Sequence, residues 1–279
     1  MNKLLVRIKS ALHMIVAFTV ALIFILPLYW AFILSLGEPG APIDTIQWWP
    51  TAFNFGNFSR IFTIVPMQRY LINSLLVVSA AVPITLFFAS LAGFGLSQLP
   101  AFLRSQMVQL TLVLLLIPSA AVWLFRYQIL NWLGLLDSLW ALIIPSFAAS
   151  NPLFVLLFYW AFRRIPNDMY EAARLDAANA WTIWSQLAMP LVHPTSVGVI
   201  VLTFIMYWSD FVGPVLYIFN PQFYTLPVGM QLVNQLGNEN YALIMAAAVF
   251  MTGPVLIMFF ILQRFFLTDL SLANLFEKN

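Results

Sequence analysis

The sequence contains no cysteine and only two histidines, His13 and His193. Without cysteine the chain has no disulfide, no thiolate metal site and no cysteine nucleophile, and two histidines are too few for a histidine metal cluster. Its three lysines are Lys3, Lys9 and Lys278, and none of them follows a glycine. The chain therefore lacks the phosphate-binding loop that ends in Gly-Lys, and it binds no nucleotide in that manner.

Charged residues are also scarce. They make up 8% of the chain, while hydrophobic residues make up 62%; soluble domains are roughly 25% charged. A globular core cannot bury so much apolar surface, so we expect the solvent of this chain to be a lipid bilayer. The net charge of +2 gives no indication of nucleic acid as a partner. The apolar run from Ala11 to Leu36 is too long for a secretory signal, and no small-residue cleavage site follows it.

The pattern of apolar residues predicts an all-α membrane protein with six transmembrane helices. A helix needs about 20 apolar residues to cross the bilayer core, and six segments meet this requirement. Within a single transmembrane domain of residues 1–279, the predicted spans are about 11–36, 71–97, 106–130, 139–162, 196–219 and 241–265. Kinks are expected at the prolines inside or near these spans, because proline removes a backbone donor. These are Pro83, Pro118, Pro145 and Pro214.

The basic residues predict the orientation of these spans, because cytoplasmic loops carry an excess of Lys and Arg. If the N-terminus is cytoplasmic, the opposite side keeps only Arg60 and Arg69, with Arg126 near a helix end. Both termini are then cytoplasmic, and residues 37–70 form the main external loop. The basic residues on the cytoplasmic side would be Lys3, Arg7, Lys9, Arg104, Arg163, Arg164, Arg174, Arg264 and Lys278.

One short segment concentrates charge within this apolar chain. Six charges fall within residues 163–176, between the charge-free runs 138–162 and 177–209. Pro166 marks a break, and Asp168 with Glu171 has the spacing of a capping box, so we predict a helix there. Such a helix is typical of a loop that an integral membrane protein presents to a soluble partner. From the pattern alone, a merely solvated amphipathic helix is the alternative.

The same segment resembles the EAA loop of bacterial ABC importer permeases. The matches are Glu171-Ala172-Ala173 and, at the family's distance, Leu187-Ala188-Met189-Pro190. Other segments are similar to the second permease of maltose-type carbohydrate importers, in order and over nearly the whole chain. They are residues 69–75, 133–143, 224–229 and 263–266.

The resemblance implies a type I ABC importer permease fold, in the bacterial cytoplasmic membrane. The chain would form half of a heterodimeric pathway with a second permease. It would work with two ATPase subunits that bind ATP and Mg²⁺, and with an extracytoplasmic solute-binding protein. It would itself bind no cofactor and not be an enzyme. A coupling helix over about 167–185 would contact the ATPase through Glu171, Ala172, Ala173, Asp176 and Ala177.

Two positions depart from the family pattern. The family has glycine where this chain has Ala177. A positive φ would cost alanine about 1 kcal/mol or more, so we expect an ordinary helical φ there. The family's glycine-rich tail is replaced by residues 269–278, which contain no glycine. A contact of that tail with the ATPase is therefore not expected.

Arg126 and Asp210 are the strongly ionisable residues within or near the spans, where charge is expensive and usually faces the bundle interior. Asp210 ends Tyr207-Trp208-Ser209-Asp210, which resembles the family's Trp-Asn-Asp-Phe region and would suit a carbohydrate. Its polar groups would bind hydroxyls and its rings would stack on the sugar. The alternatives are that Asp210 packs helices or caps an irregular turn, and that Arg126 snorkels to the outer interface.

The segment Tyr224 to Gly229 is predicted to be an external loop between the fifth and sixth spans. Pro227 fixes its φ and Gly229 permits a tight turn, so the loop can hold a defined shape. By resemblance it would project toward the docked binding protein; the alternative is a simple re-entry turn. The residues of this predicted binding-protein loop are Thr225, Leu226, Pro227, Val228 and Gly229.

Other functions remain to be weighed against carbohydrate import. The solute could instead be a sugar phosphate or a glycerol-phosphate-like molecule. The chain could also be a scaffold that recruits an ATPase without translocating a solute, against which the polar set around Asp210 argues. An intramembrane enzyme would need convergent acid, base or metal groups, and two histidines with no cysteine do not provide them.

Overall fold

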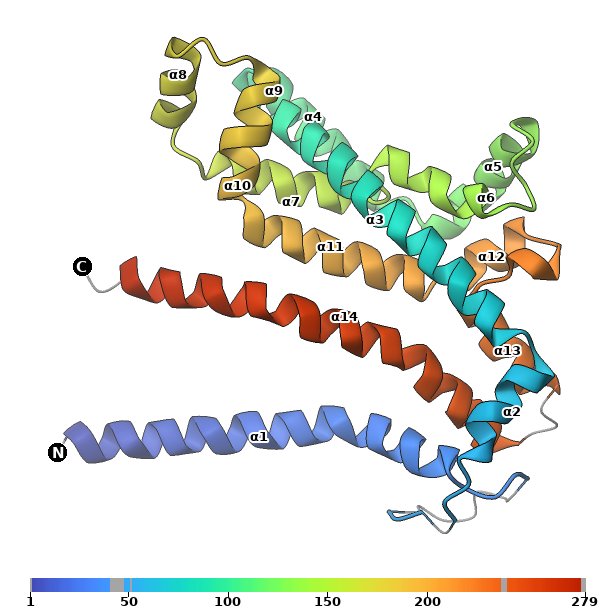
Figure 1. The fold of residues 1–279 in the computed structure, drawn as a ribbon. Coiled ribbons are helices and arrows are strands. Elements are labelled where there is room, and N and C mark those ends of the chain that lie inside the picture. The colour runs from blue at the N-terminus through green and yellow to red at the C-terminus, as the bar shows by residue number, and fades with distance from the viewer. Residues whose placement is uncertain (1, 41–47, 51, 237–239, 277–279) are drawn as a thin grey trace. The chain divides into compact units, whose positions relative to one another are not determined.

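The computed structural model describes residues 2–40, 48–50, 52–236 and 240–276. Lys278 and the end of the 269–278 tail lie outside the described residues, as do residues 41–47 of the predicted external loop. All regular elements of the described chain are helical (Figure 1). They are α1 (Asn2–Ser35), α2 (Gly56–Ile64), α3 (Met67–Gln98), α4 (Ala101–Leu115), α5 (Ser119–Trp132), α6 (Leu139–Ile143), η1 (Ile144–Ala148), α7 (Pro152–Arg163), α8 (Asn167–Leu175), α9 (Ala180–Thr182), η2 (Ile183–Ala188), α10 (Met189–Leu191), α11 (His193–Trp208), α12 (Val212–Tyr217), η3 (Pro221–Phe223), α13 (Leu226–Leu236) and α14 (Tyr241–Phe276).

Four helical segments are long and apolar enough to cross a membrane by themselves: Leu12–Ser35, Met67–Gln98, Leu139–Arg163 and Tyr241–Gln263. Two bent pairs of helices bring the count to six if each pair is one span. The kink expected at Pro118 in the predicted span 106–130 is confirmed, because α4 and α5 meet at 94°. Pro118 stands directly before α5, where its ring prevents α4 from continuing.

The fifth predicted span also differs from the structure. Helix α11 ends at Trp208, and residues 209–211 separate it from α12, so 196–219 is not one helix. On the other side, α11 meets the Ala180–Leu191 segment at 83°. A polar break near Asp210, close to the kink expected at Pro214, therefore divides the predicted span into two helices.

The described chain divides into two compact units. The first comprises residues 1–67 and 229–254. Within it the Asn57 side chain donates hydrogen bonds to the carbonyl oxygens of Ser35 (2.8 Å) and Gly37 (2.9 Å), which ties α2 to the end of α1. Phe62 packs edge-on against Phe250, with ring centroids 5.2 Å apart. Helix α1 itself is largely exposed and apolar, as a surface in contact with lipid would be.

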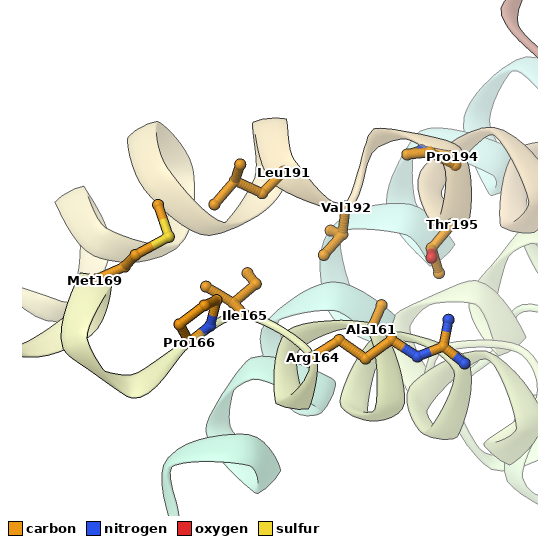
Figure 2. Close-up of a pocket in the computed structure, with 9 residues that line it drawn as sticks. All are labelled: Ala161, Arg164, Ile165, Pro166, Met169, Leu191, Val192, Pro194 and Thr195. Atoms are coloured by element: carbon orange, nitrogen blue, oxygen red, sulfur yellow. The ribbon is translucent and has the colours of Figure 1, made fainter. Parts of the chain in front are cut away.

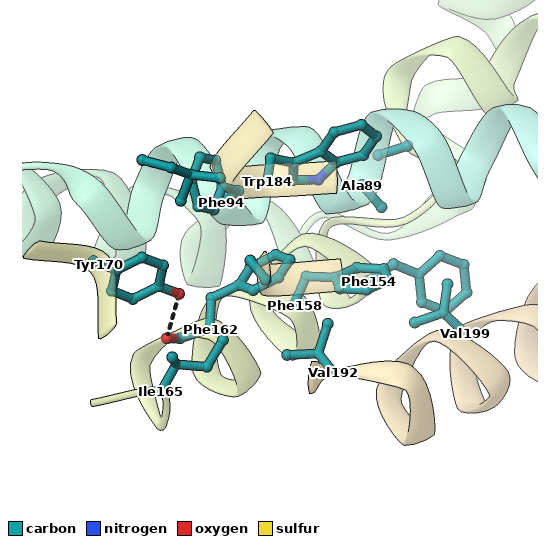
Figure 3. Close-up of a cluster of buried hydrophobic side chains, with 13 residues drawn as sticks. Ala89, Phe94, Phe154, Phe158, Phe162, Ile165, Tyr170, Trp184, Val192 and Val199 are labelled. Carbon is teal, nitrogen blue, oxygen red and sulfur yellow. Dashed lines mark hydrogen bonds between the residues drawn. The ribbon is translucent and has the colours of Figure 1, made fainter. Parts of the chain in front are cut away.

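The second unit comprises residues 68–228 and 255–279 and contains both candidate sites. Its largest buried cluster lies where α3, α7 and the α8–α10 segment meet (Figure 3). Phe94 packs edge-on against Phe162 at a centroid distance of 5.6 Å. Gly93 permits this close packing, since a Cβ at Gly93 would lie 2.6 Å from the Cβ of Phe158. Small residues let membrane helices approach closely in this way.

Candidate functional site

The charged segment forms helix α8, which begins one residue after Pro166. The predicted capping box is wrong. Its acid would have to precede the helix, but Asp168 is the second helical residue and no side chain caps the N-terminus. Asp168 instead lies in the first turn, where its negative charge complements the helix dipole. The predicted coupling helix over 167–185 is also shorter as a regular helix, because α8 ends at Leu175.

The end of α8 is a Schellman motif. The Ala178 N–H donates to the Ala173 carbonyl at 3.0 Å, and the Ala177 N–H donates to the Arg174 carbonyl at 3.0 Å. This pair of bonds requires a left-handed residue at position 177, and Ala177 has φ 60°. The expectation of an ordinary helical φ at Ala177 is therefore wrong. The hydrogen bonds hold alanine in a conformation that costs it roughly 1–2 kcal/mol.

Helix α8 presents most of the residues predicted to contact a partner. Glu171, Ala172 and Asp176 are exposed, and Leu175 is 88% exposed.

Tyr170 holds α8 to the rest of the unit. It is buried, with 4% of its surface exposed, and its hydroxyl donates to the Phe162 carbonyl of α7 at 3.1 Å (Figure 3). Burial raises the pKa of Tyr170 from 10.0 to about 12. Tyr170 is not among the site residues predicted from the sequence; its one available signal is that it is the lone aromatic side chain of α8.

A groove of about 360 Å³ runs beside the first turn of α8 (Figure 2). Met169 lies at one end, and the Arg164 side chain runs back along α7 toward Thr195 at the other. The groove continues the exposed surface of α8 onto α10 and α11. It is lined by Ala161, Arg164, Ile165, Pro166, Met169, Leu191, Val192, Pro194 and Thr195.

A second cavity, of about 350 Å³, contains part of the polar set predicted from the sequence. Arg126, Tyr207 and Asp210 line it together. Trp208 does not line the cavity. Its buried ring stacks on that of Phe204, with ring centroids 5.5 Å apart. Ser209 is also absent from the lining, and its hydroxyl donates to the Ile205 carbonyl at 2.6 Å. The lining residues are Ser119, Trp123, Arg126, Ala141, Leu142, Pro145, Ser150, Asn151, Met206, Tyr207, Asp210, Val212 and Tyr217.

The Asp210 side chain lines the cavity and also makes a hydrogen bond that stabilises the start of α12. Its carboxylate accepts the Gly213 N–H at 3.0 Å, which satisfies an amide at the start of α12. A Cβ at Gly213 would lie 2.4 Å from the Asp210 carboxylate, so the glycine is what allows the carboxylate to sit there. The alternative in which Asp210 caps an irregular turn is thus confirmed, and the same carboxylate lines the cavity.

The turn before α7 is a feature of the cavity that is not predicted from the sequence. Ala149 and Ser150 have φ 58° and 56°, a left-handed pair that costs energy for residues other than glycine. The Ser150 hydroxyl shares hydrogen bonds with Thr85 of α3 and, at 2.9 Å, with Tyr207 of α11. Asn151 caps α7 by accepting the Leu153 N–H. Asn-Pro after an apolar run is a helix-start signal, but nothing local indicates the left-handed pair.

The segment predicted to be a binding-protein loop is neither exposed nor a loop. Thr225, Leu226, Pro227, Val228 and Gly229 are all buried, and α13 begins at Leu226. The side chain of Asn73 donates to the Gln222 and Tyr224 carbonyls, both at 2.8 Å. The Ser74 hydroxyl accepts the Leu226 N–H at 2.8 Å. Pro227 therefore helps to start a helix rather than to shape a projecting loop.

The fold and these sites define an all-helical membrane protein with an exposed charged helix, α8, and a polar cavity within one unit. The chain belongs to the family described as the inner membrane component of binding-protein-dependent transport systems, whose model matches residues 81–271. The expectation of an ABC importer permease subunit is confirmed.

Several curated relatives are carbohydrate transport permeases. The chain is 27% identical over 227 residues to the arabinooligosaccharides transport system permease protein AraQ of Bacillus subtilis, covering 81% of this chain and 80% of that protein. It is 28% identical over 250 residues to the sulfoquinovosyl glycerol transport system permease protein SmoH of Agrobacterium fabrum, covering 89% and 88%. It is 26% identical over 275 residues to the trehalose/maltose permease MalG of Thermococcus litoralis, covering 96% and 97%.

Solved structures share the fold. A chain of a bacterial ABC transporter involved in the import of the acidic polysaccharide alginate superposes with a TM-score of 0.75 at 20% identity, over 93% of this chain and 97% of that one. A chain of an alginate transporter in complex with its alginate-pentasaccharide-bound periplasmic protein superposes with a TM-score of 0.63 at 15% identity, over 92% and 94%. The predicted type I importer fold is therefore confirmed.

Proposed function

We propose that this chain is one half of a heterodimeric pathway for carbohydrate import, powered by a separate ATPase that binds ATP and Mg²⁺. The observation that carries the proposal is the pairing, within one unit, of an exposed docking helix with a polar and aromatic cavity. The carbohydrate assignment is supported by the names of relatives that cover four fifths or more of the chain.

The ATPase side of the proposal rests on α8. Glu171 and Asp176 offer carboxylates for charge-assisted hydrogen bonds, exposed Leu175 offers apolar surface, and the small side chain of Ala172 allows close approach. The groove beside Met169 extends the same docking surface. A dimer of ATPase subunits would cover one such surface on each permease.

The solute side rests on the cavity. Tyr207 and Trp123 supply rings, while Asp210, Ser150 and Asn151 supply polar atoms, the combination with which proteins bind sugars. An extracytoplasmic binding protein would deliver the solute, since the family is binding-protein-dependent. In this arrangement α8 faces the cytoplasm, and both termini lie on that side of the bacterial cytoplasmic membrane.

The experiment co-expresses the chain with its partner permease, ATPase and binding protein. Uptake into proteoliposomes is then measured with labelled arabinooligosaccharide, maltose and trehalose. Glu171→Lys is expected to lower ATPase co-purification and binding-protein-stimulated hydrolysis. Glu38→Lys, an exposed charge reversal in the predicted external segment, is the matched control. Normal co-purification and hydrolysis in Glu171→Lys would refute the role of α8.

A second candidate solute is an anionic sugar, such as a sugar phosphate, because the cation of Arg126 lines the cavity. Asp210 in the same wall would oppose an anion. Arg126→Gln separates the two candidates: it should abolish uptake of a sugar phosphate and leave uptake of a neutral oligosaccharide in place. No uptake of sugar phosphate by wild type would remove this candidate, and equal uptake by wild type and Arg126→Gln would show that Arg126 does not recognise the phosphate.

A further inference from the structure

Helix α8 contacts both α7 and α3. Tyr170 donates to the Phe162 carbonyl of α7, and its ring centroid lies 6.3 Å from that of Phe94 of α3. Arg174 makes a separate contact with the end of α3. The Arg174 guanidinium donates a hydrogen bond of 2.7 Å to the Gln98 side-chain oxygen at the last residue of α3. The contacts of Tyr170 alone would leave α8 free to turn about that side chain. The Arg174 contact lies about one helical turn further along α8 and fixes the direction of the helix.

The Gln98 amide is itself held in place. Its nitrogen donates to the Ser97 hydroxyl at 3.1 Å, and that hydroxyl donates to the Phe94 carbonyl at 2.7 Å. The amide oxygen is thereby turned toward Arg174. A glutamine with this orientation is prepared to receive the guanidinium rather than free to sample other rotamers.

Helices α3 and α7 are joined again nearer the cavity, at the middle of α3 and the start of α7. Thr85 of α3 and Ser150, directly before the cap of α7, share a hydrogen bond at the cavity, and Ser150 also bonds Tyr207. Residues 85 to 98 span about 20 Å of helix and contain no proline. Midway, Gly93 lies against the backbone of α7, with Tyr159 N and Val155 O both 2.8 Å from where its Cβ would be.

We infer that Gln98 is a positioning residue: by holding Arg174, it makes α3 and α7 move with α8 as one rigid lever that acts on the cavity. The inference rests on the proposed function and adds to it a residue outside the docking helix. A rigid pair of helices transmits a displacement because its packing has no intermediate arrangement. If the Gln98 contact is lost, α8 still docks but pivots about Tyr170, and its motion no longer reaches the cavity.

The test uses the assembled complex and a single cysteine at the cavity. Ser119→Cys places the only thiol of this chain at the cavity wall. Its rate of modification by a charged maleimide is measured with and without Mg-ATP, beside ATPase co-purification and hydrolysis. The parent is expected to show an ATP-dependent change in rate. Gln98→Ala is expected to lose that change while retaining the ATPase and its hydrolysis.

Two further variants separate a positioning role from general damage. The exchanged pair Gln98→Arg with Arg174→Gln restores a guanidinium–amide contact and should restore the ATP-dependent change. Gln106→Ala removes an exposed glutamine that lies near the start of α4, and should leave the ATP-dependent change unaltered. Gln98→Ala complexes that keep the full change would overturn the inference, as would an equal loss in Gln106→Ala or no recovery in the exchanged pair. A parent that neither binds an ATPase nor responds to ATP would instead overturn the proposed function.

Discussion

Gly93 of α3 and Phe158 of α7 are in contact without room for a side chain between them: a Cβ at Gly93 would lie 2.6 Å from the Phe158 Cβ. The nearest other atoms are backbone atoms of α7, which cannot move aside as the end of a flexible side chain can. The pair therefore sets the separation of the two helices that connect α8 to the cavity.

Gly93→Ala is expected to destabilise the protein by about 1–3 kcal/mol, the usual cost of overpacking. Gly95→Ala is the matched control. It lies one half-turn away in the same helix, and nothing approaches within 4 Å of where its Cβ would be. There alanine should be neutral or stabilise by about 0.5–1 kcal/mol through helix propensity. Thermal unfolding midpoints in detergent measure both, and a Gly93→Ala midpoint equal to that of Gly95→Ala would contradict the packing argument.

The Schellman motif at Ala177 predicts a stabilising substitution. Ala177→Gly removes the steric cost of a left-handed alanine and should stabilise the end of α8 by about 1 kcal/mol. Ala172→Gly, in the interior of the same helix, should instead destabilise it by about 1 kcal/mol. Hydrogen exchange of the α8 amides reports this local stability directly. Exchange in Ala177→Gly that is as fast as in wild type, or faster, would contradict the steric cost assigned to the left-handed alanine.

Tyr170 predicts a pH dependence at alkaline pH. Its pKa is raised from 10.0 to about 12 in the folded protein because the ring is buried. Between those pH values the folded state keeps the Tyr170 proton and the unfolded state releases it. The contribution of the protonated hydroxyl to the free energy of unfolding is therefore intact below pH 10 and is lost as the pH rises toward 12. The wild-type melting temperature should fall more steeply over that range than that of Tyr170→Phe. Parallel curves would exclude the contribution.

The sequence predicted those features that depend on local pattern. Residue type and spacing predicted a helix after Pro166 and, as one alternative, a break near Asp210. They also placed Tyr207 and Asp210 in one polar set, and both line the same cavity in the structure. What it did not predict depends on contacts between distant segments. Asn73 and Ser74 bind the chain near Leu226 and bury the segment predicted to project as a loop.

Backbone conformation was the second source of error. Alanine and serine are poor left-handed residues, so neither Ala177 nor the Ala149-Ser150 pair signals a positive φ by type. At Ala177 two backbone hydrogen bonds outweigh the cost. The left-handed Ser150 makes hydrogen bonds to Thr85 and Tyr207, which belong to two other helices. Neither partner can be recognised from the sequence before the helices are packed.

Asp210 and Gly213 are expected to be coupled energetically. Gly213→Ala places a methyl group against the Asp210 carboxylate, 2.4 Å from its nearest oxygen, and should destabilise the protein by about 1–3 kcal/mol. Asp210→Ala loses the bond to the Gly213 N–H, a loss of about 1 kcal/mol, but makes room for the methyl group. The double variant should therefore be more stable than the sum of the two single effects predicts. Strict additivity of the melting-temperature changes would mean that the Asp210 carboxylate adopts another rotamer in Gly213→Ala and does not contact the new methyl group.

The orientation proposed for the membrane can be measured directly because the chain has no cysteine. Glu171→Cys in α8 and Trp49→Cys in the predicted external loop both replace exposed residues. An impermeant maleimide added to intact spheroplasts should label Trp49→Cys and not Glu171→Cys, and should label both after permeabilisation. The expectation follows from the excess of Arg and Lys on the α8 side of the predicted spans. Labelling of Glu171→Cys from outside would invert the topology and separate α8 from any cytoplasmic ATPase.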